Sequence, residues 1–374
     1  MAVSVSDAGK TVLISYGRED IRMKDTYKII IWGLGSVGRS ALQIINQRRS
    51  LELVAAYDVD PKKTGRDAGE VCGFEACGVK VSADREEVLA TPADIVLYYA
   101  SSVWDKGSLP DFETCTANVD DIVDFLNHGK NVATTISVYY SAKNAPAYFA
   151  RIDEAARAHG VTFTQMGIFP GLFTPYLPTI FALLARKVNR CIIYGGQDDS
   201  ANTAPWVNFL CYGKTVEDDI PAPQFAFLKN LFYTYYGPTV IEITERAGLE
   251  YDEYRCEVEQ IPADAEITTP NAHILPGTIG CHVFKMATYK DGREVVGFHF
   301  NHKGSNEILK DYTVDKMIEF DGEPHIKVEI EGIIDHFDPF LTSAAPSVNM
   351  IPAIVAAEPG YHDALDIPLG YLPK

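Results

Sequence analysis

The fold of this chain is decided by Lys28-Ile-Ile-Ile-Trp-Gly-Leu-Gly-Ser-Val-Gly38. The segment begins with a continuous apolar run, which is typical of a central parallel strand buried on both faces. Gly33, Gly35 and Gly38 follow in the spacing G-x-G-x-x-G, and the next residues, Arg39 to Gln47, predict an amphipathic helix. The glycine string alone is weak, but between a buried strand and a helix it indicates a dinucleotide-binding turn.

An acidic residue at the expected distance supports this interpretation. Leu51 to Tyr57 predicts a second strand, and Asp58 ends it, 20 positions after Gly38. A carboxylate at this place accepts hydrogen bonds from the ribose of the adenosine and repels a 2′-phosphate, so we predict NAD as the preferred cofactor. Lys62, Lys63 and Arg66 follow closely and leave NADP open as the alternative.

The predicted cofactor contacts lie at the carboxyl ends of strands, where ligands bind in open parallel sheets. The helix that follows the glycine turn would offer its unpaired N–H groups to the pyrophosphate. Two further strands end in small polar residues that would border the nicotinamide. The predicted set is Gly33, Gly35, Ser36, Val37, Gly38, Asp58, Ala100, Ser101, Ser102 and Thr134.

The order of predicted elements indicates an α/β fold with two parts. Strands and helices alternate up to Gln165, which predicts a Rossmann-type parallel sheet domain with helices on both faces. After Gly171 come an apolar helix, Thr174 to Arg186, and longer strands, two of which flank an Asp291-Gly292 hairpin turn. This part predicts an α+β substrate domain with a largely antiparallel sheet. The predicted division is 1–26, N-terminal extension; 27–170, dinucleotide-binding domain; 171–340, substrate domain; 341–374, a helix (341–357) and tail that return to the first domain.

Composition and charge limit the possible partners and the location. The formal net charge of −18 argues against nucleic acid and membrane surfaces, because an acidic surface repels phosphates. No run of 18 apolar residues and no signal-peptide pattern occurs. The seven cysteines include no Cys-x-x-Cys pair, so we expect neither a metal nor a disulfide framework, and free thiols favour a cytoplasmic location.

The chain resembles the dihydrodipicolinate-reductase-like proteins, and it is most similar to the branch of 2,4-diaminopentanoate dehydrogenase and the native NAD(P)H-dependent amine dehydrogenases. The matching segments are Gly33–Gly38, Asp58–Glu70, Gly129–Val132, Gly167–Gly171 and Asn349–Gly360. The resemblance implies hydride transfer between a nicotinamide and a C=N or C=O carbon of a small molecule. It also implies a homodimer formed through the second domain, and it assigns Asn349 to the nicotinamide carboxamide.

Reduction of such a bond also requires a proton donor. The related amine dehydrogenases carry a glutamate just after the strand that corresponds to Asn131 to Ile136, where this chain instead continues to Tyr139 and Tyr140. We name these two tyrosines as candidate catalytic residues. His299 is the third candidate, provided that its face of the hairpin strand lines the cleft. Glu113, in the loop after the fourth strand, could supply a carboxylate.

The predicted substrate pocket is aromatic, with Phe169, Phe173, Tyr176 and Trp206 as candidate wall residues. No arginine cluster is available to bind a carboxylate, so a fairly apolar substrate is expected. Amine or imine oxidoreduction is the favoured activity. A ketone/alcohol or enone reductase, and a dinucleotide-binding protein without turnover, are the alternatives.

Overall fold

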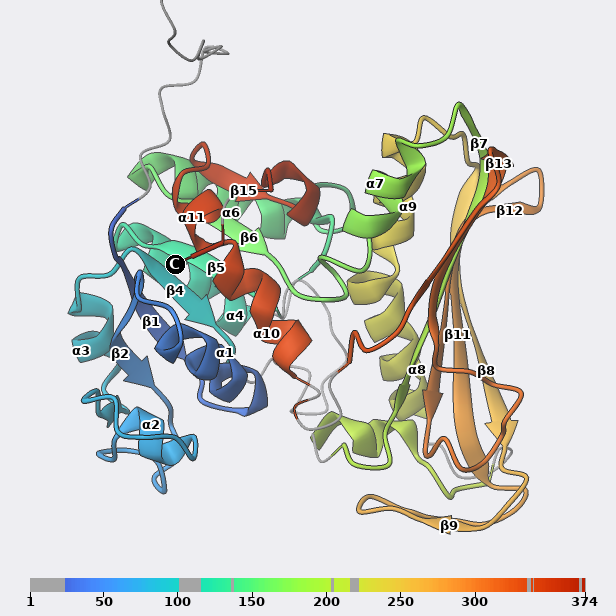
Figure 1. The fold of residues 1–374 in the computed structure, drawn as a ribbon, viewed down its shortest axis with the longest axis horizontal. Coiled ribbons are helices and arrows are strands. Elements are labelled where there is room, and N and C mark those ends of the chain that lie inside the picture. The colour runs from blue at the N-terminus through green and yellow to red at the C-terminus, as the bar shows by residue number, and fades with distance from the viewer. Residues whose placement is uncertain are drawn as a thin grey trace, which may run out of the picture.

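The computed structural model describes residues 24–100, 116–135, 138–202, 205–215, 222–334, 338, 340–369 and 372–373. A parallel sheet wrapped by helices forms one side of the molecule, and a tall second sheet forms the other (Figure 1). The helices α7 (Tyr176–Ala182), α8 (Ala222–Leu231) and α9 (Pro238–Arg246) lie between the two. The predicted fold class is confirmed, whereas the exact domain boundaries stay predictions.

Within the described residues, seven strands form an all-parallel sheet in the order β15-β6-β5-β4-β1-β2-β3. Ile29 and Ile31 of β1 are completely buried, as expected for a strand covered by helices on both faces. The strand bounds are β1 Tyr27–Trp32, β2 Leu51–Tyr57, β3 Val81–Ser82, β4 Ile95–Tyr98, β5 Asn131–Thr134, β6 Thr162–Gln165 and β15 Gly360–His362. β15 was not predicted, and it places the C-terminal segment at the edge of this sheet.

The predicted helix Arg39 to Gln47 is found as α1 (Ser36–Asn46), whereas the predicted C-terminal helix is broken. The predicted helix 341–357 is two helices, α10 and α11, separated at Met350, because Pro352 has no amide hydrogen to continue the helical ladder. The helix bounds are α1 Ser36–Asn46, α2 Ala68–Val71, α3 Arg85–Ala90, α4 Thr116–Asn127, α5 Ser141–Asn144, α6 Pro146–His159, α10 Leu341–Asn349, α11 Ile351–Val355 and the short η4 Ala364–Asp366.

Over the part of the chain that the structure describes, a second, mixed sheet contains six strands in the order β14-β13-β7-β12-β11-β8, of which only β7 and β12 pair in parallel. The predicted hairpin joins β11 to β12, and both turn residues, Asp291 and Gly292, have positive φ as a type I′ turn requires. The bounds are β7 Lys187–Asp198, β8 Glu253–Pro262, β11 Ile279–Lys290, β12 Arg293–Lys303, β13 Lys316–Glu323 and β14 Ile326–Ile330, with a separate ribbon of β9 Ile267–Thr268 and β10 His273–Ile274.

A run of helices absent from the sequence prediction covers one face of the second sheet. It contains the 3₁₀ helix η2 (Pro205–Leu210), α8, the π-helical η3 (Phe232–Tyr236) and α9. Beneath them lie buried aromatic side chains, among them Phe284, Phe298 and Phe300. α7 is shorter than the predicted Thr174 to Arg186, since it begins after the N-cap Pro175 and ends at Ala182. No helix in the described ranges is long and apolar enough to cross a membrane.

Candidate active site

The glycine turn leaves open space at one of its three glycines. A Cβ on Gly33 would lie 2.8 Å from the amide nitrogen of Ala100, and a Cβ on Gly38 would lie 2.1 Å from the carbonyl oxygen of Gly33. These two glycines are therefore required for close packing of strand, turn and helix. A Cβ on Gly35 would meet no described atom within 4 Å. This opening, at the N-terminus of α1, fits the pyrophosphate of a dinucleotide.

Asp58 lies beside the same turn, where its carboxylate is held by three donors. Its Oδ2 accepts hydrogen bonds from the Leu34 N–H (3.0 Å) and from Nζ of Lys63 (2.7 Å), and its Oδ1 accepts one from the Asp60 N–H (2.9 Å). Burial acts to raise the pKa of Asp58, but these hydrogen bonds outweigh it, so the pKa is lowered. Asp58 is therefore an ionised acceptor, and the ammonium of Lys63 stands next to it.

The remaining predicted cofactor residues differ in accessibility. Ser36 is exposed, and Val37 and Ala100 are half-buried around the turn. Thr134 is fully buried at the end of β5 and donates its hydroxyl hydrogen to the Tyr98 carbonyl, so it contributes to the sheet edge mainly through its backbone. Ser101, Ser102 and Glu113 lie outside the described residues.

Asn349, the last residue of α10, offers an unsatisfied acceptor near the same edge. Its Oδ1 is buried and has no hydrogen-bond partner among the described residues. The helix is tied to the carboxyl end of β4 by a hydrogen bond of 2.6 Å between the hydroxyls of Ser347 and Tyr99. A buried carbonyl oxygen without a partner is unfavourable, and the carboxamide NH₂ of a nicotinamide would satisfy it.

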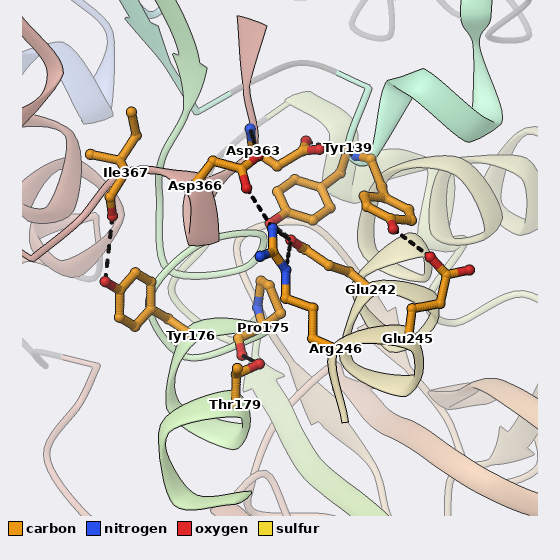
Figure 2. Close-up of polar contacts among 11 residues, drawn as sticks. Tyr139, Pro175, Tyr176, Thr179, Glu242, Glu245, Arg246, Asp363, Asp366 and Ile367 are labelled. Carbon is orange, nitrogen blue, oxygen red and sulfur yellow. Dashed lines mark hydrogen bonds and ion pairs between the residues drawn. The ribbon is translucent and has the colours of Figure 1, made fainter. Parts of the chain in front are cut away.

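The two predicted catalytic tyrosines bind carboxylates of α9 (Figure 2). Tyr139 is fully buried and donates to Oε2 of Glu242 (2.7 Å), and Tyr140 donates to Oε2 of Glu245 (2.5 Å). Burial, reinforced by these carboxylates, raises the pKa of both phenols. Both hydroxyls are thus engaged in joining the two parts of the molecule.

The same cluster extends to the C-terminal segment (Figure 2). Arg246 bridges Oε1 of Glu242 (3.0 Å) and Oδ1 of Asp366 (2.6 Å), while Asp363 accepts the Tyr140 N–H. Burial raises the pKa of Glu242 to about 7, and it raises the pKa of Asp363 as well. This polar cluster connects the cofactor side, α9 and the tail.

The structure places His299 on the face of the second sheet opposite to the helices. Its Nε2 lies 2.6 Å from Oε1 of Glu294, and its ring meets Tyr194 edge to face. The alternate residues Phe298 and Phe300 point toward the helices and contact Phe169. His299 itself is not among the described residues that line the cavity beside Phe169, although its ring neighbour Tyr194 is, so its catalytic role stays a prediction.

The predicted pocket residues divide into wall, core and periphery. Phe169 is half-buried and packs against Phe298 and Phe300, whereas Phe173 is fully buried core. The Tyr176 hydroxyl donates a hydrogen bond to the Ile367 carbonyl in the C-terminal segment, at 3.4 Å (Figure 2). Trp206 lies in η2, but its side chain is outside the described residues.

A cavity of about 880 Å³ opens beside Phe169, between the loop after β6, the start of α10 and the second sheet. Ile168, Phe169 and Phe340 give it an apolar wall. Its other lining residues include four acids, which are Asp198, Asp315, Glu329 and Glu331. Lys316 also lines it, but its ammonium is bound by the carbonyls of Gly196 and Val314. The cavity therefore combines apolar surface with negative charge.

Sequence reasoning missed one residue, Tyr235, that reaches the carboxyl edge of the parallel sheet. The Tyr235 hydroxyl donates to the carbonyl of Thr135, the first residue after β5. The sequence signal for it is only the aromatic density of Phe232 to Tyr236, which does not show where each ring points.

Among the described residues no group of three or more His, Cys, Asp and Glu could hold a metal ion.

The chain is similar to two protein families and to several named dehydrogenases. Residues 27–104 match the family of the dihydrodipicolinate reductase N-terminus, and residues 236–372 match that of the 2,4-diaminopentanoate dehydrogenase C-terminal domain. An amine dehydrogenase of Streptomyces virginiae is 25% identical over 355 residues, covering 91% of this chain and 96% of the relative. The 2,4-diaminopentanoate dehydrogenase of Acetoanaerobium sticklandii is 23% identical over 364 residues, covering 91% and 93%.

Among solved structures, the amine dehydrogenase from Mycobacterium smegmatis has the same fold, with a TM-score of 0.70 at 19% identity over 93% of this chain and 98% of that one. These matches confirm the resemblance predicted from the sequence. The matched relatives are dehydrogenases, and this chain is an oxidoreductase of that class with a nicotinamide dinucleotide as cofactor.

Proposed function

We propose that this chain interconverts an amine and the corresponding imine by hydride transfer with a nicotinamide cofactor. The substrate is a small amine with an apolar body. The observation that carries this proposal is the cavity beside Phe169, which joins an apolar wall to four carboxylates. Amines are cations at neutral pH, so negative charge at the cavity attracts them, and the apolar wall buries their hydrocarbon part.

The family resemblance supports the same chemistry. The named relatives that align with nine-tenths of this chain are dehydrogenases of amines, including a diamino acid. The apolar wall and the absence of an arginine among the cavity residues agree with an apolar substrate rather than a diacid.

The chain's own residues would bind the cofactor and orient the substrate. The N–H groups at the start of α1 and the space beside Gly35 would hold the pyrophosphate, Asp58 the adenosine ribose, and Asn349 the carboxamide. When bound, the nicotinamide accepts or donates a hydride at its C4. Phe169 and Phe340 would exclude water from the reacting carbon, and the cavity carboxylates would keep the amine nearby.

NAD is the proposed preferred cofactor, with NADP accepted less well. Asp58 is ionised and faces the turn, which favours ribose hydroxyls over a 2′-phosphate. Lys63 offsets part of that repulsion. Titration of the enzyme with NADH and NADPH tests this, and equal or tighter binding of NADPH would contradict it.

A homodimer is proposed as well, on the family resemblance and on the sheet face that bears His299, which no helix covers in Figure 1. Light scattering coupled to gel filtration measures the mass directly. A mass of one chain, 41.3 kDa, at micromolar concentration would contradict the dimer.

The activity is tested in the direction of oxidation. NAD⁺ reduction is followed with a panel of primary amines and with the alcohols of the same carbon skeletons. We expect turnover of amines with an alkyl or aryl body and none of the matched alcohols. Turnover of alcohols alone would replace the proposal with ketone/alcohol chemistry, and tight cofactor binding without any turnover would leave a nucleotide-binding protein.

A further inference from the structure

A short stretch of π-helix directs one tyrosine out of the second domain. η3 lies between α8 and α9. π-helical turns are rare in proteins, and those that occur are often found at functional sites. Phe232 and Tyr236 stack on each other within the aromatic cluster of the second sheet. Tyr235, between them, instead reaches the first domain and donates its hydroxyl hydrogen to the Thr135 carbonyl.

Thr135 marks the carboxyl edge of the parallel sheet, one residue beyond β5. Its methyl group would lie 3.4 Å from a Cβ placed on Gly167, and the Ser343 carbonyl would lie 3.7 Å from the same point. Ser343 in turn lines the cavity. The Tyr235 hydroxyl therefore lies at the carboxyl edge of the parallel sheet, where ligands of this fold bind, and Thr135 connects it through Gly167 to the cavity wall.

Gln165, the last residue of β6, is fully buried, and neither its side-chain oxygen nor its side-chain nitrogen has a hydrogen-bond partner among the described residues. Burial raises the pKa of Tyr235 well above its usual value, and the Gln165 side chain acts in the opposite direction. A carboxamide can accept from a phenol and donate to a phenolate, so it can hold the ring in either protonation state. The Tyr235 side chain as a whole is half-buried, and its hydroxyl lies on the inside, against the Thr135 carbonyl.

The tyrosines predicted from the sequence are committed elsewhere. Tyr139 and Tyr140 donate to Glu242 and Glu245, and the first of them is fully buried. His299 faces away from the helices. Tyr235 also donates its hydroxyl hydrogen, but to a backbone carbonyl at the end of β5 rather than to a carboxylate of α9.

We propose that Tyr235 is the catalytic acid and base of the reaction and that Gln165 is its positioning residue. This inference rests on the proposed function. During reduction, the imine carbon gains a hydride from the reduced nicotinamide, and the C=N electron pair moves onto nitrogen. That nitrogen takes the proton of the Tyr235 O–H bond, and water reprotonates the phenolate. During oxidation, the phenolate removes the proton from nitrogen while the hydride leaves carbon.

The first test compares Tyr235→Phe with Tyr233→Phe, a control in the same helix whose ring is 43% exposed. General acid catalysis contributes about 10²-fold or more, so Y235F should lower kcat about 100-fold and remove the limb of the pH profile that belongs to the acid. Y233F should keep the wild-type kcat and the wild-type pH profile. A kcat within twofold of wild type and an unchanged pH profile in Y235F would overturn the proposal.

A second readout needs no turnover. The affinity for NADH, measured by fluorescence, should be the same in wild type and Y235F. The affinity of the NADH-bound enzyme for the amine should fall about tenfold in Y235F, as expected for one lost hydrogen bond. Equal amine affinity in both proteins counts against contact between Tyr235 and the substrate nitrogen.

Gln165 is tested through its partner. Gln165→Leu should lower kcat and shift the pH profile, and the double variant Q165L/Y235F should be no slower than Y235F, because Gln165 acts only through the phenol. Fully additive losses would overturn the positioning role.

The wild-type enzyme separates this inference from the proposed function. If it reduces ketones without ammonium, the proposed function fails, but the proton then goes to oxygen and the same variants decide the role of Tyr235. If wild type turns over no substrate, both proposals fail.

Discussion

The ammonium of Lys63 lies 2.7 Å from Oδ2 of Asp58, so the acid that we propose to bind the ribose has its own counter-ion. The pair is partly shielded, with side-chain exposures of 25% for Lys63 and 11% for Asp58. Removing the ammonium leaves the carboxylate unopposed toward a 2′-phosphate. We expect Lys63→Ala to weaken NADPH binding about tenfold and to change NADH binding less than about threefold.

Lys62→Ala is the matched control, because Lys62 is a neighbouring exposed lysine whose backbone N–H, rather than its ammonium, makes the local contact. Isothermal titration of each variant with both cofactors gives the comparison. Equal losses for NADH and NADPH in K63A would show that Lys63 supports the turn rather than the choice of cofactor.

Glu242 makes stability depend on pH. Its pKa is raised to about 7 by burial, against hydrogen bonds from Tyr139 and Arg246 that lower it, while an unfolded glutamate titrates near about 4.3. Between these values the folded protein holds a proton that the unfolded chain has released. The free energy of unfolding therefore falls as pH rises through this window, by about 4 kcal/mol at most.

Glu242→Gln should flatten that slope between about pH 4.5 and 7, measured by urea unfolding at several pH values. Asp363 also has a raised pKa, so some slope remains in the variant. Glu245→Gln is the contrast: the pKa of Glu245 is lowered, its stabilisation is lost only as pH falls further, and the wild-type slope should persist. An E242Q slope equal to wild type would refute a proton held at Glu242.

Phe169 forms part of the apolar wall and is predicted to act on substrate binding. Phe169→Ala should raise KM for amines with a bulky apolar body about tenfold or more and change kcat less, because it removes buried contact that ground state and transition state share. Phe149→Ala, a half-buried aromatic that packs on Tyr361 at the far side of the sheet, is the control. A purely kcat effect in F169A would contradict this role.

His299 is predicted to be dispensable for chemistry. Its contact with Glu294 lies on the sheet face away from the helices, so His299→Ala should keep kcat and the pH profile within about twofold. Steady-state rates across the pH range check this. A loss of more than tenfold with an altered pH profile would instead support His299 as a proton donor.

The sequence predicted the cofactor half of the site because its signals are local. Gly33 to Gly38 and Asp58 act through spacing along one βαβ unit, and the Asp291-Gly292 turn encodes its own positive φ values. The other half of the site depends on contacts between residues that lie far apart in the sequence. β15 has three residues, and its partner β6 lies almost 200 positions earlier, so no local pattern marks it.

The proton donors were harder to predict for a related physical reason. Alternation shows that His299 and Phe300 lie on opposite faces of a strand, but not which face the helices cover. Tyr235 reaches the sheet edge only because η3 has π-helical register, and no hydrophobic period encodes that register. The positions of Tyr139 and Tyr140 depend on α9, which the sequence analysis did not predict.

The most direct test of the central claim follows NADH oxidation by the purified wild-type enzyme with a panel of apolar ketones, with and without ammonium, and identifies the product by mass. We predict turnover only with ammonium and a primary amine as product. Equal turnover without ammonium, with an alcohol as product, would contradict chemistry at a C–N bond.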